Sequence, residues 1–290
     1  DRAEGVGRAL DLLGLNPVKG KEVLLKPNFN SAHPTPGSTH NDTLRALVIN
    51  MQEMGANHIT VGDRSGMGQT RQVMETKGIF SLGEKLGFDT VVFDELEEGQ
   101  WVTVSLEDSH WRQGFPMARP CLDAEVVVQT CCLKTHRFGG HFTLSLKNSV
   151  GLVAKTVPGS SYNYMSELHS SPYQRQMIAE INSAYSPSLI VLDGVEAFVN
   201  QGPDVGKKVQ AEVILAGTDR VAIDAVGVAI LRHFGTTPEV SRGAIFEQDQ
   251  IARAVELGLG ISKAEGIELV TDDAESESYA NAIREILEKG

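Results

Sequence analysis

Residues 125–130 of the chain read Glu-Val-Val-Val-Gln-Thr, three consecutive valines between polar residues. A short apolar run of this kind is typical of a strand that is buried on both faces of a parallel sheet. Similar runs occur at Glu22–Lys26 (EVLLK), His58–Gly62 (HITVG) and Leu189–Asp193 (LIVLD), with longer amphipathic stretches between them. This alternation predicts βα units, and therefore an α/β fold with a mixed, mainly parallel sheet flanked by helices.

Helices are predicted where apolar residues recur with helical spacing. In Asn41–Met54 they follow the i, i+3, i+4, i+7 pattern from Leu44 to Met51, and Gly55 ends the helix. The same reasoning predicts further helices at Arg2–Leu13, Gln69–Lys77, Leu82–Leu86, Phe142–Leu152, Gln174–Ala184, Asp219–His233 and Ile245–Leu257, and from Glu275 to the end of the chain.

The remaining segments are less regular. Further strands are predicted at Thr90–Phe93, Val213–Ala216 and Ile267–Val270, and a peripheral or antiparallel strand at Trp101–Leu106. Val157–Ser171 is rich in Pro, Gly, Ser and Tyr, which favours a long loop or lid. With 290 residues the chain can bury a full core, so we expect a single domain over 1–290. The long middle insertion suggests an inserted or second smaller subdomain at about 100–185.

Composition limits the classes of partner. The net charge of −12 argues against a nucleic-acid partner, because phosphate backbones are bound mainly by clustered Lys and Arg. Three cysteines, two of them adjacent at Cys131 and Cys132, do not supply the roughly four thiolates of an iron–sulfur cluster, so none is expected from this chain. No apolar run approaches the roughly 20 residues of a membrane span. The expected location is the cytoplasm, with an already removed signal peptide as the alternative because the chain opens at Asp1.

Polar side chains at the ends of the predicted strands are the first candidates for a site, because ligands of open α/β sheets bind beyond the carboxyl ends of the strands. Lys26 ends the run EVLLK, and Asn28 and Asn30 follow directly. An ammonium group and two carboxamides can bind an anion, and we assign all three to substrate binding. The alternative is an ordinary turn, in which asparagines are common.

The segment Leu133–Asn148 carries the greatest density of basic residues. Lys147 lies among small and apolar residues, where burial would lower its pKa and make it a base or an anion clamp. His136 can donate or accept a proton near neutral pH. We therefore assign catalytic roles to Lys134, His136 and Lys147, and substrate binding to Asn148. The alternative is a polar loop with one buried histidine.

Carboxylates and glycines supply the other candidates. Asp224 lies in a predicted helix that is apolar all round, so it needs a cation or hydrogen-bond donors, with Lys26 or Lys147 as expected partners and a role in substrate binding. Asp193 ends the run LIVLD, and its carboxylate is predicted to bind a cation or to balance the charge of the lysines; the alternative is a turn that begins at this Asp before Gly194. The loop Gly62–Gly68 follows a strand and precedes a helix, which suits an anion, but it matches neither the dinucleotide fingerprint nor the P-loop. If a metal ion is used, its ligands are predicted to be His136, His141, Asp193 and Asp63.

Five segments occur together in the order VLLKPNFN, HITVGDRSG, LKTHRFGGHFTLSLKNSVGL, LDGVEAFVNQGPDVG and AGTDRVAIDAVG. In this the chain resembles, from about Val23 to Val270, the domain-of-unknown-function family numbered 362. The resemblance implies an association with iron–sulfur proteins or ferredoxins, although the Cys-x-x-Cys-x-x-Cys run of a ferredoxin module is missing here. It also implies that the motif positions are Lys26, Asn28, Lys134, His136, Lys147, Asn148, Asp193, Gly202, Pro203, Asp219 and Asp224.

The sequence thus predicts an enzyme that binds a small anionic metabolite, a carboxylate or phosphate compound, in a cleft lined by Lys and His. Its chemistry would be proton transfer or oxidoreduction, and a metal ion or an electron-transfer protein is an optional participant. The second hypothesis is a non-catalytic accessory protein that docks a ferredoxin-type partner, and nucleotide binding through Gly62–Gly68 is the third.

Overall fold

In the computed structural model, which describes all 290 residues, seven strands form one mixed sheet. The spatial order is β3-β2-β1-β6-β8-β9, and β7 pairs with β6 beside this path. The first five strands of this order run parallel, whereas β9 is antiparallel to β8 and β7 is antiparallel to β6. The predicted mixed, mainly parallel sheet is confirmed. The strands are β1 (Glu22–Lys26), β2 (His58–Asp63), β3 (Asp89–Val92), β6 (Val126–His136), β7 (His141–Thr143), β8 (Pro187–Gln201) and β9 (Gly206–Gly217).

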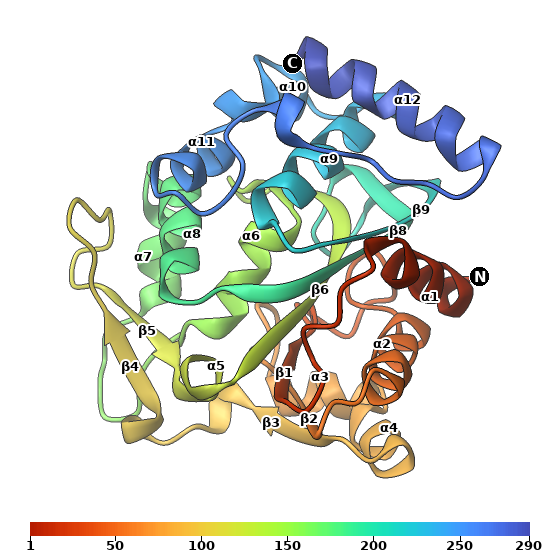
Figure 1. The fold of residues 1–290 in the computed structure, drawn as a ribbon. Helices are drawn as coiled ribbons and strands as arrows, with labels where there is room; N and C mark the ends of the chain where they lie inside the picture. Colours follow the sequence, from red (N-terminus) through yellow and green to blue (C-terminus); the bar gives the residue numbers. More distant parts are fainter.

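Helices cover both faces of this sheet (Figure 1). Because neighbouring strand residues point to opposite faces, β1 places Val23 and Leu25 in one hydrophobic core and Leu24 in another. The first face is covered by α1 (Arg2–Leu13), α2 (Asn41–Glu53), α3 (Thr70–Thr76) and α4 (Ile79–Leu86). The second is covered by α6 (Ser145–Asn148), α7 (Tyr164–Ser170), α8 (Gln174–Ile181), α9 (Arg220–His233), α11 (Asp249–Glu256) and α12 (Ala274–Lys289).

Local signals place several helix ends. The carboxylate of Asp1 accepts hydrogen bonds from the N–H groups of Ala3 and Glu4 at the start of α1, and Gly14 ends that helix at φ 65°. Asp219 caps α9 in the same way, accepting from Val221 N and Ala222 N. The two remaining short helices are α5 (Arg119–Asp123) and α10 (Pro238–Ser241).

A small antiparallel sheet is formed by β4 (Trp101–Val104) and β5 (Phe115–Ala118), which confirms the peripheral strand predicted at Trp101–Leu106. It packs with α7 and α8 on the second face of the main sheet. The range 100–185 also contains β6, a central strand of that sheet. The division into a domain 1–290 and a subdomain at about 100–185 stays a prediction.

Three predicted elements differ from the structure. Ile267–Val270 forms no strand, because Ile267 and Leu269 pack against the core of the second face without a neighbouring strand to pair with. Val157–Ser171 is not a loop throughout, since it ends in α7. Phe142–Leu152 is not one helix: it begins in β7 and continues through α6 into a short 3-10 helix at Ser149–Leu152. None of the helices combines the length and apolar character needed to cross a bilayer.

Candidate functional site

The predicted cluster of strand-end residues is built by three adjacent parallel strands. β1 lies between β2 and β6, so the carboxyl ends of β1 and β2 open at the same edge of the sheet as the second half of β6. A cavity of about 190 Å³ lies at this edge. We call it the Lys147 cleft, and the lining residues used below are Lys26, Asn28, Asn30, Asp63, Arg64, His136, Thr143, Lys147, Asn148, Gly151, Lys155 and His169.

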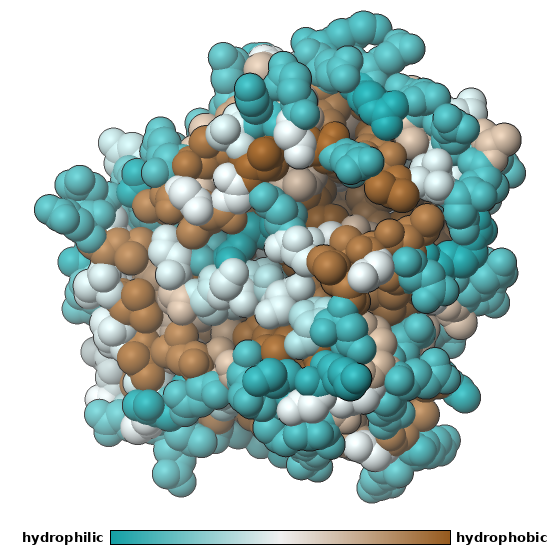
Figure 2. Space-filling model, in the orientation of Figure 1, coloured by the Kyte–Doolittle hydropathy of each residue, from teal (hydrophilic) through white to brown (hydrophobic).

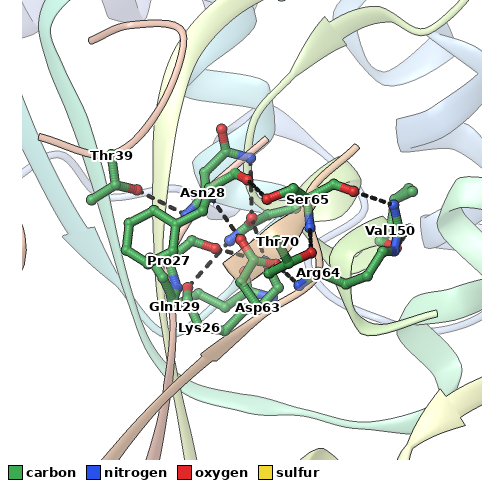
Figure 3. A network of polar contacts seen from close by, with 12 residues as sticks. Lys26, Pro27, Asn28, Thr39, Asp63, Arg64, Ser65, Thr70, Gln129 and Val150 are labelled. Carbon is green, nitrogen blue, oxygen red and sulfur yellow. Dashed lines mark hydrogen bonds and ion pairs between the residues drawn. The ribbon is translucent and has the colours of Figure 1, made fainter. Parts of the chain in front are cut away.

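A buried ion pair forms one wall of the Lys147 cleft (Figure 3). Nζ of Lys26 lies 2.8 Å from Oδ1 of Asp63, and the two side chains are 1% and 2% exposed. The same ammonium donates to the carbonyl of Pro27 at 2.6 Å and to Oδ1 of Asn148 at 3.0 Å. Three acceptors around one Nζ match the three N–H groups of an ammonium. Burial lowers the pKa of Lys26, and the charge of Asp63 opposes that shift.

Asp63 is held in place from the backbone. Its Oδ2 accepts a hydrogen bond from Phe29 N at 2.6 Å, and its Oδ1 accepts from Arg64 N at 2.7 Å. Gly151 packs directly on the pair: a Cβ at this position would lie 2.8 Å from Nζ of Lys26 and would overlap the Asp63 carboxylate. Position 151 therefore requires a glycine, because any side chain would collide with Lys26 and Asp63.

Lys134 lies beneath the cleft and is completely buried. It lies inside β6, where it is paired with Thr143 of β7 and Phe198 of β8, and not in a loop as its neighbours in the sequence suggested. Its Nζ donates to Oδ1 of Asn28 at 2.9 Å and to the carbonyl of Gly37 at 2.7 Å. Burial lowers the pKa of Lys134 to about 8. In this position Lys134 contacts Asn28 and does not line the cavity.

Lys147 is carried into the cleft by α6 and is 7% exposed. Unlike Lys26 and Lys134, Lys147 donates no hydrogen bond to another protein group, and no carboxylate lies within ion-pair distance of its ammonium. Burial, followed by the positive charges of Arg64 and Lys134, lowers the pKa of Lys147 to about 7. At neutral pH this side chain therefore exchanges readily between amine and ammonium.

His136 ends β6 beside Lys147 and is 8% exposed. A Cβ on Gly140 would lie 2.8 Å from Cε of Lys147 and 3.0 Å from Nδ1 of His136, so both side chains crowd the same glycine. Nδ1 of His136 is buried and has no hydrogen-bond partner. Burial, and then the charges of Lys147 and Lys134, hold the pKa of His136 well below its usual value, so the imidazole is neutral at pH 7.

Two further buried polar atoms at the cleft lack partners, Nδ2 of Asn30 and Oγ1 of Thr143. The predicted residues Lys26, Asn28, Asn30, His136, Lys147 and Asn148 thus line one cavity together. Sequence reasoning missed the contributions of Arg64, Thr143, Gly151 and Lys155, which the structure also places on its wall. Arg64 carried a signal, since it follows Asp63 in the strand-end loop Gly62–Gly68. Thr143 and Gly151 lie within the family segment LKTHRFGGHFTLSLKNSVGL, whereas Lys155 carried no signal.

Asp193 does not face the cleft. It lies within β8, which continues to Gln201, and its Oδ2 accepts hydrogen bonds from Arg2 Nε at 2.9 Å and Thr43 Oγ1 at 2.5 Å. The predicted opposition of Asp193 to the lysines is wrong, because the strand does not end where the apolar run ends. Its charge is instead balanced on the first face of the sheet by Arg2 of α1, and Thr43 of α2 adds a neutral hydrogen bond.

Asp224 has no lysine partner either. Its side chain is fully buried, and its Oδ1 accepts from Ser145 N at 2.7 Å and Leu146 N at 3.2 Å, the first N–H groups of α6. Gln250 Nε2 lies 3.3 Å from Oδ2. Burial raises the pKa of Asp224 to about 8. Its predicted pairing with Lys26 or Lys147 is wrong: Asp224 holds the start of the helix that carries Lys147 and does not reach the cavity.

The four predicted metal ligands do not lie together. His136 and Asp63 line the cleft, but Asp63 is engaged by Lys26, Asp193 by Arg2, and the half-buried His141 lies outside the lining residues. No group of three or more His, Cys, Asp or Glu side chains is arranged to hold a metal ion. His136, His141, Asp193 and Asp63 therefore do not form one metal site.

The cysteines do not fit an iron–sulfur cluster. Cys121, Cys131 and Cys132 are free and buried, with Cys131 and Cys121 in different hydrophobic cores. Burial raises the pKa of all three thiols, to about 12 for Cys121, whereas cluster ligands are thiolates.

Three N–H groups of the loop Gly62–Gly68 already donate hydrogen bonds to other atoms of the protein. Arg64 N donates to Asp63 Oδ1, Ser65 N to Thr70 Oγ1 at 2.8 Å, and Met67 N to the carbonyl of Asn30 at 2.8 Å. A phosphate nest requires such groups to point outward together. The loop geometry therefore gives no support to the nucleotide hypothesis.

A larger cavity of about 480 Å³ lies between α1, β9 and α12. It is lined mostly by apolar side chains, and in Figure 2 hydrophobic residues gather in the hollow between α12 and the strands, surrounded by hydrophilic ones. None of the lysine and histidine residues described above lines it. Lys26, His136 and Lys147 line the smaller Lys147 cleft.

Fold and cleft together define a mixed α/β protein with a small cavity lined by Lys and His at the carboxyl edge of its parallel strands. Residues 23–229 match the family described as Domain of unknown function (DUF362), and the chain belongs to this family.

Two further comparisons describe similar proteins. A thylakoid-associated protein of Synechocystis sp. is 29% identical over 218 residues, which are 73% of this chain and 64% of that protein. The chain thus spans less than two thirds of the length of this relative. Among solved structures, the lactate racemase apoprotein from Thermoanaerobacterium thermosaccharolyticum is similar with a TM-score of 0.47 and 17% identity, over 75% of this chain and 52% of the racemase chain.

Proposed function

We propose that the chain is an enzyme that binds a small anionic metabolite, a carboxylate or phosphate compound, in the Lys147 cleft and transfers a proton there. One observation carries the proposal: Lys147 is 7% exposed, lines a cavity and has no partner for its charge. Burying an ammonium group without a partner is strongly unfavourable. A lysine in such a position is therefore expected to bind a ligand whose negative charge balances the ammonium.

The size of the cavity supports a small ligand. Sites for drug-sized molecules occupy roughly 300–1,000 Å³, whereas the Lys147 cleft has about 190 Å³. Asn28 and Asn148 are fixed by Lys134 and Lys26, so their carboxamides are oriented before any ligand arrives. Prearranged polar groups of this kind orient a ligand without having to be ordered on binding.

His136 is the proposed proton acceptor. The low pKa that follows from its burial keeps the imidazole neutral, and a neutral imidazole has one nitrogen free to accept a proton. In the proposed step a proton leaves the bound compound for the unprotonated nitrogen of the neutral His136 imidazole, while Lys147 as ammonium stabilises the negative charge that remains on the compound. If the reaction is instead metal-assisted or redox-linked, the metal or the electrons come from a cofactor or from an electron-transfer protein.

The second hypothesis is a non-catalytic accessory protein that docks a ferredoxin-type partner. A docking role predicts that Lys147 and His136 point into bulk solvent, where a partner surface can reach them. Both are more than nine-tenths buried and border the cleft, which favours the enzyme. The cytoplasmic location stays a prediction.

The proposal is tested by Lys147→Met, which keeps the length of the side chain but removes its charge. Lys85→Met, at an exposed lysine on α4, is the matched control. Inorganic phosphate, malonate and acetate are titrated while the thermal midpoint is followed, because a ligand at about 100 times its Kd stabilises by about 2.7 kcal/mol. We expect anion-dependent stabilisation in the wild type and in Lys85→Met, and its loss in Lys147→Met. Equal stabilisation of all three proteins would place the anion elsewhere.

Catalysis is separated from binding by isotope exchange. A panel of small carboxylates and phosphate esters is incubated with the protein in D₂O, and deuterium incorporation is followed by NMR. Exchange that depends on His136, and is abolished in His136→Ala while anion binding persists, is the expected result. Binding without exchange in any compound of the panel would favour the accessory protein.

A further inference from the structure

The surroundings of the Lys147 cleft contain more buried positive charge than buried negative charge. Lys26, Arg64, Lys134 and Lys147 are 1%, 2%, 0% and 7% exposed. Among the lining residues the only carboxylate is Asp63. With all side chains in their charged forms, four cations therefore face one anion in this part of the interior.

Three of these four cations have no carboxylate in contact. Lys26 is paired with Asp63. Arg64 donates only to the backbone carbonyls of Ser65, Val150 and Val153 and to the thioether of Met165, with Nε 2.9 Å from the Val153 oxygen. Carbonyl and thioether acceptors satisfy N–H groups but supply no opposing charge.

Lys134 and Lys147 are the other two. Lys134 donates to one carboxamide and one backbone carbonyl. Lys147 donates to none of the protein's acceptors and borders the cavity directly. Two carboxylates outside the cleft act on these cations without touching them, Asp94 on Arg64 and Asp204 on Lys134. Each is already paired, Asp94 with Lys155 at 3.3 Å and Asp204 with Arg137 at 2.6 Å. The protein therefore leaves buried positive charge uncompensated on three different elements around one cavity.

We infer that the natural ligand of the Lys147 cleft carries at least two negative charges on oxygen atoms, as a phosphate-type or dicarboxylate dianion. This rests on the proposed function and narrows its ligand class, because a monoanion would leave most of the excess charge unbalanced. The unpartnered donors Asn30 Nδ2 and Thr143 Oγ1, together with Lys147, offer separate contacts to a ligand with several oxygens.

Binding of a dianion has a pH signature that follows from the same groups. The charges that lower the pKa of Lys147 are those of Arg64 and Lys134, and no carboxylate opposes them. Lys147 in turn lowers the pKa of the neighbouring His136 and His169. A bound dianion raises the pKa of Lys147 above its free value of about 7. Binding then takes up a proton wherever free Lys147 is neutral, so affinity is greatest below pH 7 and falls above it, by about tenfold per pH unit for one proton.

Sulfate and methyl sulfate test the inference, because they share a tetrahedral shape and differ by one negative charge. Neither changes its charge between pH 6 and pH 9, so only the protein titrates. Calorimetric titration at constant ionic strength should give a Kd at least about tenfold lower for sulfate than for methyl sulfate at pH 6.5. Sulfate affinity should fall from pH 7 to pH 9, and in Lys147→Met both the preference and the pH dependence should be smaller, because only Arg64 and Lys134 remain without a carboxylate in contact.

The possible outcomes separate this inference from the proposed function. If methyl sulfate binds as tightly as sulfate, and both depend on Lys147, the dianion inference is overturned and the anion site stands. If sulfate affinity is independent of pH, the uncompensated lysine is not in contact with the anion, and the inference is also overturned. If neither ion binds, or if binding is the same in Lys147→Met as in Lys85→Met, the proposed function fails as well. The sulfate and methyl sulfate comparison uses wild-type protein, so it does not depend on how any variant folds.

Discussion

The ammonium of Lys26 lies 2.8 Å from the carboxylate of Asp63, and both groups are almost fully removed from solvent. The two residues end adjacent parallel strands, so the central sheet itself brings them together. Removing one partner of a buried ion pair lowers stability more than replacing both partners by apolar residues, because the remaining charge is left uncompensated.

Asp63→Asn should therefore destabilise the protein by about 3–5 kcal/mol. The asparagine removes the charge that balances Lys26 and one of the acceptors used by Phe29 N and Arg64 N. Urea unfolding followed by circular dichroism measures the effect, with Asp89→Asn at an exposed position as the control. If Asp63→Asn lowers the free energy of unfolding no more than Asp89→Asn does, the Lys26–Asp63 pair is not needed for stability.

Asp224 should make stability depend on pH. Its carboxyl has a folded-state pKa of about 8 because of burial, above the value of 3.8 for an unburied aspartate. The folded state then holds a proton that the unfolded state has lost, so the contribution of Asp224 is greatest below about pH 4 and falls as the pH rises toward 8. The slope of this fall is at most about 1.4 kcal/mol per pH unit.

Asp224→Asn should remove that pH dependence. An asparagine can still accept from Ser145 N and Leu146 N, and its amide can donate to Oε1 of Gln250, which has no partner in the wild type. The free energy of unfolding of the two proteins is compared between pH 4 and pH 8. Parallel curves would contradict a buried, protonated Asp224. Asp224→Ala, which leaves the start of α6 without an acceptor, should cost about 1–3 kcal/mol at any pH.

Gly140→Ala should impair anion binding more than stability. The new methyl group would lie 2.8 Å from Cε of Lys147 and 3.0 Å from Nδ1 of His136, and the flexible end of Lys147 is the part that can move away. We expect sulfate affinity to fall at least about tenfold, while the free energy of unfolding changes by less than about 1 kcal/mol. Gly99→Ala, where a Cβ meets no atom within 4 Å, is the matched control. Unchanged binding in Gly140→Ala would show that the ligand does not need this arrangement.

The three thiols should be unreactive in the folded protein. Cys121, Cys131 and Cys132 are buried, and burial raises the pKa of each. Since the thiolate is the reactive form, a chromogenic disulfide reagent should label none of them within minutes under native conditions and all three in denaturant. Rapid labelling of the native protein would reveal an exposed thiolate, and with it a cysteine available to a metal or a redox partner.

Much of the fold is predictable from the sequence because its signals are local. The apolar runs at Val23–Leu25, Val126–Val128 and Leu189–Leu192 have strands as their simplest solution, and the amphipathic stretches between them have helices. Where those strands end was less evident. β6 and β8 continue beyond their apolar runs because each pairs with an antiparallel strand that follows it after a four-residue turn, β7 after residues 137–140 and β9 after residues 202–205.

The same distinction applies to the cleft. The sequence by itself identified Lys26, Asn28, His136, Lys147 and Asn148 as polar residues in apolar surroundings, and the adjacent strand ends bring these five to one cavity. It could not assign charge partners, because ion pairs depend on distances between elements. Only the tertiary structure shows that Asp63 pairs with Lys26, that Asp193 pairs with Arg2, and that Asp224 accepts hydrogen bonds from the start of α6. As a result, Lys147 is buried without a carboxylate to balance its charge.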